Sequence, residues 1–190
     1  MTKTQARRYF IARAKDVQRI MKDGSPWGFL CAAAFLDVLA KLVAGGDLKR
    51  TGYKSFVRKF LSKIDRSYQT FTYINGKQDL PDQIYHVFRC GIIHSFSLVP
   101  DQQAIRNGGR VRSIALCHKK ESRKKHLPHL SNYSSGATRD AAVFVAEDFS
   151  RDLRKVVSLI FSQDAKQIEP NINRNIRSWL CQHPPIRGGF

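Results

Sequence analysis

The stretch that decides the fold is PWGFLCAAAFLDVLAKLVA, which runs from Pro26 to Ala44. Its apolar residues occupy almost every side of a helix, and the Gly45-Gly46 pair that follows is a typical helix stop. Asp37 and Lys41 interrupt the stretch, and the sequence has no second apolar run of this length. We therefore expect a central helix buried in a hydrophobic core rather than a membrane span.

Further helices are predicted wherever apolar residues recur at helical spacing. These segments are residues 3–23, 51–64, about 81–97, 147–163 and 171–182. Between residues 101 and 140 the apolar content falls, but RVRSIALCH at 110–118 and AAVFVA at 141–146 have the pattern of short strands that pair with each other. The prediction is a mainly α fold, a helical bundle with a small β-hairpin-like insertion near residues 110–146 and a mobile tip at ESRKKH.

The chain of 190 residues is long enough for one domain with a sizeable hydrophobic core. We partition this domain into a core at residues 26–163, a basic N-terminal helix at residues 3–23, an insertion at residues 101–146 and a loose tail at residues 183–190. No internal repeat divides it further.

The charge balance favours a polyanionic partner. Thirty-three Lys and Arg face fifteen Asp and Glu, which gives a formal net charge of +18. Such an excess repels itself, and phosphate backbones are the commonest partner that compensates it. We expect RNA as the partner; an anionic membrane surface and a charged surface with no partner are the alternatives.

Two features bear on the compartment. The N-terminal stretch MTKTQARRYFIARAKD has no apolar core of the signal-peptide type. The cysteines at positions 31, 90, 117 and 181 lie far apart and form no CxxC pair, as in proteins of a reducing compartment. We expect a cytoplasmic protein that does not use a membrane.

Arg89 and His94 are the side chains most suited to chemistry, since both lie in an otherwise apolar predicted helix. RNA can be cleaved without a metal when its own 2′-hydroxyl attacks the neighbouring phosphate. An imidazole moves the proton near neutral pH, and a guanidinium holds the phosphate as charge develops. The alternative is a surface Arg and a hydrogen-bonded His with structural roles only.

Helical geometry constrains this pair. On an ideal α-helix, five steps place the Arg89 and His94 side chains roughly 140° apart. They converge on one cleft only if the long Arg89 side chain wraps round the helix, if Gly91 loosens the helix, or if the cleft forms across a dimer.

The segment FRCGIIHSF at residues 88–96, followed by a short loop with Pro100, resembles the R-x(4–6)-H signature of the HEPN superfamily. The preceding apolar helix with its embedded acid, CAAAFLDVLAKL at residues 31–42, is similar to the family pattern as well. The order of a central helix, a signature helix, an insertion and a closing amphipathic helix extends the resemblance over about residues 26–163.

This resemblance implies a helical homodimer with ribonuclease activity near the dimer cleft and no cofactor. It also implies a toxin or phage-defence protein with an antitoxin partner. Arg89 would contact the phosphate, and His94 would act as general acid or base. Many catalytic members have a polar residue directly after the Arg, whereas this chain has Cys90. The alternative is therefore an inactive relative that is a non-catalytic, basic nucleic-acid-binding module.

Three neighbouring residues have two interpretations each. Asp37 either orients Arg89 or His94 as part of the catalytic set, or pairs with Lys41 one turn later for structure alone. Ser95 either helps to bind phosphate or forms a helix-end hydrogen bond. His86, near the same helix face as His94, has a weaker claim to a role in the site.

Residues 106–125 form a basic segment with eight Lys or Arg and one Glu. We expect phosphate contacts from it, or else a solvated loop. The nucleic-acid-binding candidates in this segment are Arg110, Arg112, Lys119, Lys120, Arg123, Lys124 and Lys125.

Other chemistries have little support in the sequence. Cys117, His118, His126 and His129 match no usual zinc spacing, so we expect no metal and no other cofactor. Nucleophile-elbow, P-loop and dinucleotide-binding motifs are missing from the sequence. A third, non-enzymatic alternative is a structural partner of an acidic protein.

Overall fold

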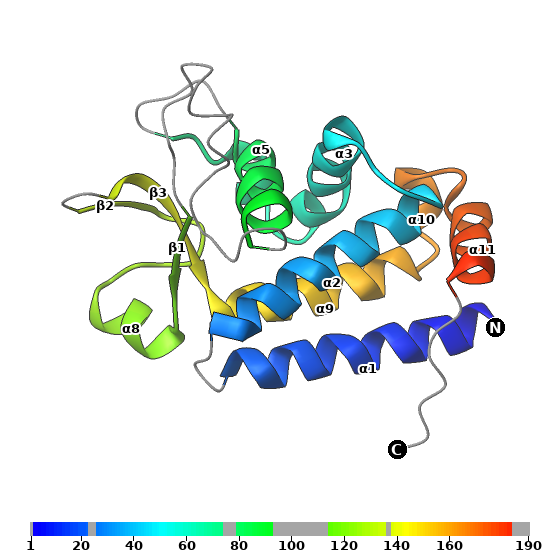
Figure 1. Cartoon of the computed structure of the whole chain (residues 1–190), viewed down its shortest axis with the longest axis horizontal. Coiled ribbons are helices and arrows are strands. Elements are labelled where there is room, and N and C mark those ends of the chain that lie inside the picture. The colour runs from blue at the N-terminus through cyan, green and yellow to red at the C-terminus, as the bar shows by residue number, and fades with distance from the viewer. Residues whose placement is uncertain (1, 23–25, 74–78, 93–113, 136–137, 184–190) are drawn as a thin grey trace.

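The computed structural model describes residues 2–22, 26–73, 79–92, 114–135 and 138–183 (Figure 1). Within these residues the fold is mainly α with a small three-stranded sheet, as the sequence predicts. The helices are α1 (Lys3–Lys22), α2 (Pro26–Ala44), α3 (Arg50–Phe60), η1 (Leu61–Lys63), α4 (Ser67–Thr70), α5 (Leu80–Ile84), η2 (Tyr85–Ile92), α8 (Lys119–Lys124), α9 (Ala146–Ile160), α10 (Ala165–Ile168) and α11 (Ile172–Gln182). The strands are β1 (Ile114–Cys117), β2 (Asn132–Ser135) and β3 (Thr138–Val145).

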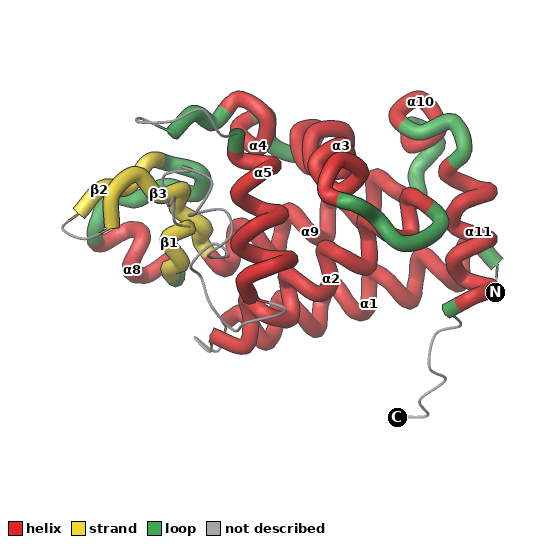
Figure 2. Tube along the Cα trace, turned by 45° about the horizontal axis from the view of Figure 1, so that its top comes forward, coloured by secondary structure: helices red, strands yellow, loops and turns green. Residues whose placement is uncertain are grey.

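Helix α2 is the central element, as its apolar sequence predicts. It lies beside α1 and α9, while α3 and the helix formed by α5 and η2 cross it on the other side (Figures 1 and 2). Gly28 permits the close approach of α1, because a Cβ atom there would lie 2.9 Å from the Cα atom of Met21. The helix ends at Gly45, whose positive φ of 80° lets its N–H and that of Gly46 donate to the Lys41 carbonyl.

Helix α2 is also long and apolar enough, by length and composition alone, to cross a membrane. This property holds for Trp27–Ala44, and 56% of that window is buried inside the protein. The core helix of a folded domain has the same length and composition.

The hydrophobic core extends beyond residues 26–163 in both directions. Helix α1 contributes Ala6, Phe10, Ala14, Val17 and Met21 to the same cluster, and α11 contributes Ile172 and Ile176. The N-terminal helix is thus an integral layer of the core, and only its outward face is basic. Helix α9 buries the residues whose spacing predicts it, namely Phe149, Leu153, Val156, Val157 and Ile160.

The insertion differs from a simple hairpin. Strands β1 and β3 do pair, but they run parallel, with Ile114 opposite Ala142 and Cys117 opposite Val145. The antiparallel partner of β3 is β2, so the strand order is β1-β3-β2. A parallel pair needs a crossover connection, and α8 with β2 supplies it here.

Most of ESRKKH, the predicted tip of the insertion, is helical, because Lys119–Lys124 form α8. Ser122 anchors this helix: its side chain is buried and its hydroxyl donates to the carbonyl of Leu127 at 2.6 Å. The segment therefore has a fixed place beside the sheet and the start of α9 (Figure 1).

The helix that carries Arg89 departs from the predicted α geometry. It begins at Leu80, and Asp79 caps it by accepting a hydrogen bond from the Asp82 N–H at 3.0 Å. From Tyr85 to Ile92 it is wound as a π-helix, in which hydrogen bonds join residues five positions apart. The sequence suggests that Gly91 loosens the helix, and Gly91 lies within this π-helical segment.

Candidate functional site

Four charged side chains form an alternating line at the contact between α2 and η2. The Asp37 Oδ1 atom lies 2.8 Å from Nε of Arg89, and its Oδ2 atom lies 3.2 Å from Nζ of Lys41. The same Lys41 ammonium lies 3.0 Å from Oδ1 of Asp47. One carboxylate thus holds two cations, and the charges within the line cancel.

Burial makes the Asp37–Arg89 contact stronger than a typical surface pair. The side chains of Asp37 and Arg89 are only 14% and 18% exposed. The surrounding dielectric is lower than in bulk water, so the attraction is screened less than at the surface. The contact is an ion pair and not a hydrogen bond, because Oδ1 of Asp37 has no hydrogen-bond partner among the described residues. A guanidinium has five N–H donors, so donors are available for an acceptor such as a phosphate.

Two tyrosine rings enclose the Arg89 guanidinium. Its Cζ atom lies 5.4 Å from the ring centre of Tyr85 and 5.9 Å from that of Tyr53. The two rings contact each other edge to face at 5.7 Å between centres. Cation–π contacts of this kind restrict the guanidinium to one place between α3 and η2.

The Tyr53 side chain lies fully buried beneath Arg89. Burial raises the pKa of its phenol well above the ordinary value of 10.0, and the Asp37 charge adds to this while Arg89 opposes it. The phenol therefore stays neutral in ordinary buffers. Its hydroxyl has no hydrogen-bond partner among the residues that the structure describes.

The π winding brings together residues that an α-helix would separate. Tyr85 and Cys90, five positions apart, interact through their side chains. Burial and Cys90 raise the pKa of Tyr85, although Arg89 lowers it in part. Within η2, which ends at Ile92, an offset of five positions is thus close to a shared face.

Lys41 and Asp47 extend the site to the surface. The pKa of Lys41 is raised, chiefly by its hydrogen bond with Asp47, and burial opposes the shift. The pKa of Asp47 is lowered by the same hydrogen bond and by the Lys41 charge. Both groups therefore stay ionised, although the Asp47 side chain is 90% exposed.

The two interpretations of Asp37 turn out to be compatible, because it pairs with Arg89 and with Lys41 at once. His94, Ser95, Arg110 and Arg112 lie outside the described residues, so their predicted roles stay predictions. His86 lies in η2, with its Nε2 atom 3.9 Å from Oδ2 of the buried Asp82.

The basic candidates on and after α8 fall into two groups. Lys119 is held to α9: its Nζ atom lies 3.2 Å from Oδ1 of Asp148, and its backbone N–H donates to Glu147. The remaining four residues are exposed and have no acidic partner among the described residues: Lys120, Arg123, Lys124 and Lys125.

Three site residues have no counterpart in the sequence-based prediction, namely Tyr53, Tyr85 and Asp47. The Tyr85 contact has a local signal, since Tyr85 precedes Arg89 by one helical turn. Tyr53 approaches the site through the tertiary fold, and Asp47 approaches it across the Gly45-Gly46 turn that ends α2. No helical spacing in the sequence indicates either residue.

Of the insertion's histidines and cysteines, His129 has a structural role. Among the described residues no group of three or more His, Cys, Asp or Glu is arranged to hold a metal ion. His129 instead joins a buried network, with Nε2 3.2 Å from the Tyr68 hydroxyl and 3.6 Å from Oδ2 of Asp152.

Comparison of the chain with known protein families, with curated proteins and with solved structures found no match. The resemblance of residues 26–163 to the HEPN superfamily therefore stays a prediction, and the arguments on function rest on the residues of this chain.

Proposed function

We propose that this protein is a metal-independent endoribonuclease that uses Arg89 and His94. One observation carries the proposal: Arg89 is fixed by Asp37 at 2.8 Å, enclosed by two tyrosine rings and still 18% exposed. A guanidinium that is both oriented and accessible is the group expected to stabilise a phosphate in a transition state.

The proposed reaction needs two functions from the protein. His94 removes the proton from the RNA 2′-hydroxyl, whose oxygen then attacks the adjacent phosphorus. The bond from phosphorus to the 5′-oxygen breaks, this oxygen gains a proton, and the products end in a 2′,3′-cyclic phosphate and a 5′-hydroxyl. Arg89 offsets the negative charge that develops on the phosphate oxygens.

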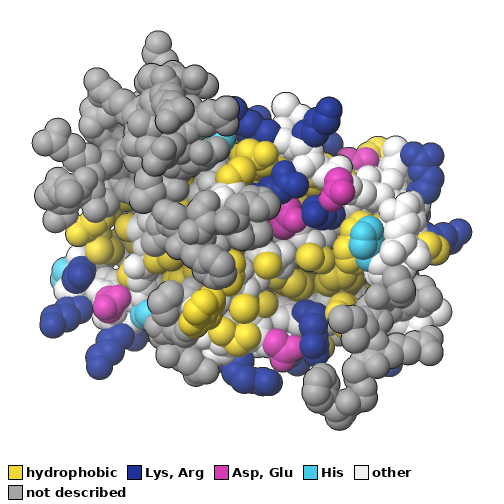
Figure 3. Space-filling model, viewed as in Figure 1, with side chains coloured by type: hydrophobic (Ala, Val, Ile, Leu, Met, Phe, Trp, Pro, Cys, Tyr) yellow, Lys and Arg dark blue, Asp and Glu magenta, His cyan; other side chains and the backbone are white. Residues whose placement is uncertain are grey.

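The proposal includes a homodimer. The outward side of α2 carries Trp27, Leu30, Cys31, Ala34 and Val38 at helical spacing, and Trp27 is 59% exposed. Figure 3 shows an apolar band over α2 on this face, with Lys and Arg around it. The band adjoins the Asp37–Arg89 site, so a second copy on it would cover the site from one side.

The first experiment incubates the purified protein with labelled single-stranded RNA in EDTA. Wild type should cleave the RNA and leave 2′,3′-cyclic phosphate ends. Arg89→Ala and Arg89→Lys should each lower the rate about 10²- to 10³-fold, since Lys offers a single ammonium in place of the oriented fork. His94→Ala should lower it by about 10²- to 10⁴-fold.

Matched controls are Arg154→Ala and His126→Ala, because both side chains are exposed and neither lies at the site. Both should cleave at the wild-type rate. A cleavage activity that requires Mg²⁺, or that survives in both Arg89 variants, would contradict the proposal. The proposal also includes a toxin or phage-defence role and a bound antitoxin. Growth arrest on expression of wild type, but not of His94→Ala, would support the toxin role.

A non-catalytic nucleic-acid-binding module is the second candidate, and a different observation favours it. Lys120, Arg123, Lys124 and Lys125 are exposed at α8 with no acidic partner among the described residues. Such side chains neutralise phosphates without any need for an oriented Arg89. RNA that wild type, Arg89→Ala and His94→Ala all bind and leave intact would support this candidate.

A further inference from the structure

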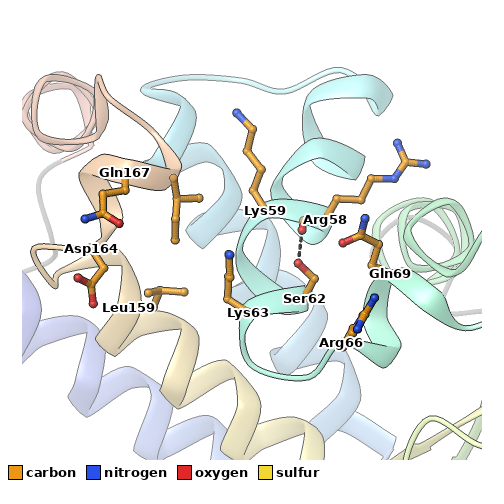
Figure 4. A pocket seen from close by; sticks show the side chains of 10 residues that line it. Arg58, Lys59, Ser62, Lys63, Arg66, Gln69, Leu159, Asp164 and Gln167 are labelled. Carbon is orange, nitrogen blue, oxygen red and sulfur yellow. Dashed lines mark hydrogen bonds between the residues drawn. The ribbon is translucent and has the colours of Figure 1, made fainter.

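A cavity of about 830 Å³ lies between the end of α3 and α10, and none of its lining residues belongs to the Arg89 site (Figure 4). Four cations line it: Arg58 and Lys59 from α3, Lys63 from η1 and Arg66 just before α4. We call this cavity the α3–α10 groove.

The local fold explains why the cations face outward together. Phe60 and Leu61 are fully buried, so the chain at the junction of α3 and η1 turns its apolar side to the core. The polar residues on the opposite side of this turn then face solvent. Figure 4 shows Lys59 and Lys63 extending into the groove, with Asp164 and Gln167 on the opposite wall.

The acidic residues of the fold compensate only part of this charge. Arg58 pairs with Asp79, and Nζ of Lys59 lies 3.3 Å from Oε2 of Glu169. Lys63 and Arg66 have no acidic partner among the described residues. Asp164 is the single carboxylate that lines the groove, and it forms no ion pair within the described part of the chain.

Cations gathered along one wall repel one another, and the fold bears that cost unless an anion joins them. The groove is large enough for a phosphate ester, and side-chain amides from Gln69 and Gln167 add hydrogen-bond donors. We propose that the α3–α10 groove is a binding site for phosphate groups, separate from the Arg89 site. This proposal does not depend on cleavage and goes beyond the proposed ribonuclease.

The test measures binding of two probes to the intact protein by fluorescence anisotropy and calorimetry. The first probe is a short single-stranded RNA with 2′-O-methyl groups, which lacks the nucleophile and so cannot be cut by the proposed reaction. The second is inorganic pyrophosphate. The test variant is Lys63→Ala/Arg66→Ala, in which both side chains are exposed and take no part in the core.

The matched control is Arg8→Ala/Lys15→Ala, which removes the same two types of charge from exposed positions on α1. We expect the groove variant to bind the RNA about tenfold more weakly at low salt. The slope of log K against log salt concentration should become shallower by about 1.4, that is by about 0.7 for each lost phosphate contact. The control should change little.

Asp164→Asn should act in the opposite direction. It removes the carboxylate from the groove wall, and Asp164 forms no side-chain capping bond to α10, so the fold loses no cap. Affinity for the probe should rise about two- to threefold by the loss of like-charge repulsion.

The two probes identify the source of the phosphate. Weaker binding of RNA by the groove variant assigns the site to a nucleic-acid backbone. Weaker binding of pyrophosphate alone assigns it to a small phosphate-bearing ligand, and both results support the site. Equal binding of both probes by the groove variant and the α1 control would overturn it, whatever the fate of RNA cleavage.

Discussion

The carboxylate of Asp37 on α2 holds the guanidinium of Arg89 on η2, with Oδ1 2.8 Å from Nε. Both side chains are largely buried, so loss of the acid leaves Arg89 without its carboxylate partner, while Lys41 keeps its contact with Asp47. Asp37→Asn should lower the free energy of unfolding by about 1 to 3 kcal/mol, because a largely buried charge loses its partner. Urea unfolding at pH 7 measures this change.

The control for Asp37 is Asp47→Asn, since Asp47 pairs with the same Lys41 but is 90% exposed. Exposed ion pairs contribute about 0 to 1 kcal/mol. An equal decrease in the free energy of unfolding in the two variants would show that the Asp37–Arg89 contact stabilises the fold no more than an exposed ion pair does. If Arg89 acts on phosphate, Asp37→Asn should also lower the cleavage rate more than Asp47→Asn does.

Much of the fold follows from local patterns in the sequence. Apolar spacing predicts α1, α2, α3, α9 and α11, because burial of one helix face repeats every turn. The parallel pairing of β1 with β3 does not follow, since it depends on the connection through α8 and β2 rather than on either strand. The sequence likewise misses the π winding of η2, because the apolar residues around Arg89 fit an α-helix equally well.

The candidate site, too, can be predicted from the sequence only in part. The contact between Asp37 and Lys41 can be read from their spacing of four, and a buried acid in an apolar helix indicates that a cation from elsewhere, here Arg89, joins it. Tyr53 comes from a different helix and has no such signal. Three of the four cations of the α3–α10 groove do have a signal in the sequence, because Lys and Arg fill the outer face of the predicted helix at residues 51–64.

Asp82 at the start of α5 should make stability depend on acid pH. Its side chain is only 3% exposed and contacts Arg50 and Lys54 at 2.7 and 3.0 Å, with His86 nearby at 3.9 Å. Burial alone would raise the pKa of Asp82, but the hydrogen bonds and charges of Arg50 and Lys54 lower it below the ordinary value of 3.8.

The direction of the pH effect follows from this lowered pKa. The folded state holds the ionised carboxylate more firmly than the unfolded state does, so the contribution is complete above about pH 4. It is lost as the pH falls through the folded pKa. Asp82→Asn should therefore be less stable than wild type at pH 7, by about 1 to 3 kcal/mol, and the difference should shrink toward pH 2.

Urea unfolding at pH 7, 4, 3 and 2 checks the Asp82 prediction. Asp16→Asn is the control, because Asp16 forms a more exposed pair with Arg13 on α1. A difference between Asp82→Asn and wild type that stays constant down to pH 2 would contradict the assignment of this acid sensitivity to Asp82.

The basic residues of α8 should differ in what they contribute. Lys120→Ala/Lys124→Ala removes two exposed cations and should weaken RNA binding while leaving unfolding unchanged. Lys119→Ala removes a side chain that is held by Asp148 on α9, so it should lower stability by about 0.5 kcal/mol and affect binding less. Fluorescence anisotropy at two salt concentrations measures RNA binding, and thermal unfolding measures stability. Weaker binding in Lys119→Ala and lower stability in Lys120→Ala/Lys124→Ala would contradict the prediction.

The network of Tyr68, His129 and Asp152 should be the main polar contribution to the attachment of the insertion. The Val145 N–H donates to Nδ1 of His129 at 3.1 Å, so the neutral ring carries its proton on Nε2 and donates it to the Tyr68 hydroxyl. That hydroxyl in turn donates to Oδ2 of Asp152 at 3.1 Å. Each polar atom that takes part in this buried hydrogen-bond network has a partner.

Tyr68→Phe keeps the ring and removes only the hydroxyl, which leaves His129 and Asp152 each without one partner in a buried place. The free energy of unfolding should fall by about 1 to 3 kcal/mol, the cost of an unsatisfied buried polar group. Tyr133→Phe on β2 is the matched control and should change stability by less than about 0.5 kcal/mol. Because the hydroxyl links α4, the insertion and α9, hydrogen exchange should speed up at β3 in Tyr68→Phe; a loss of protection confined to α4 would show that the network does not tie the insertion to the core.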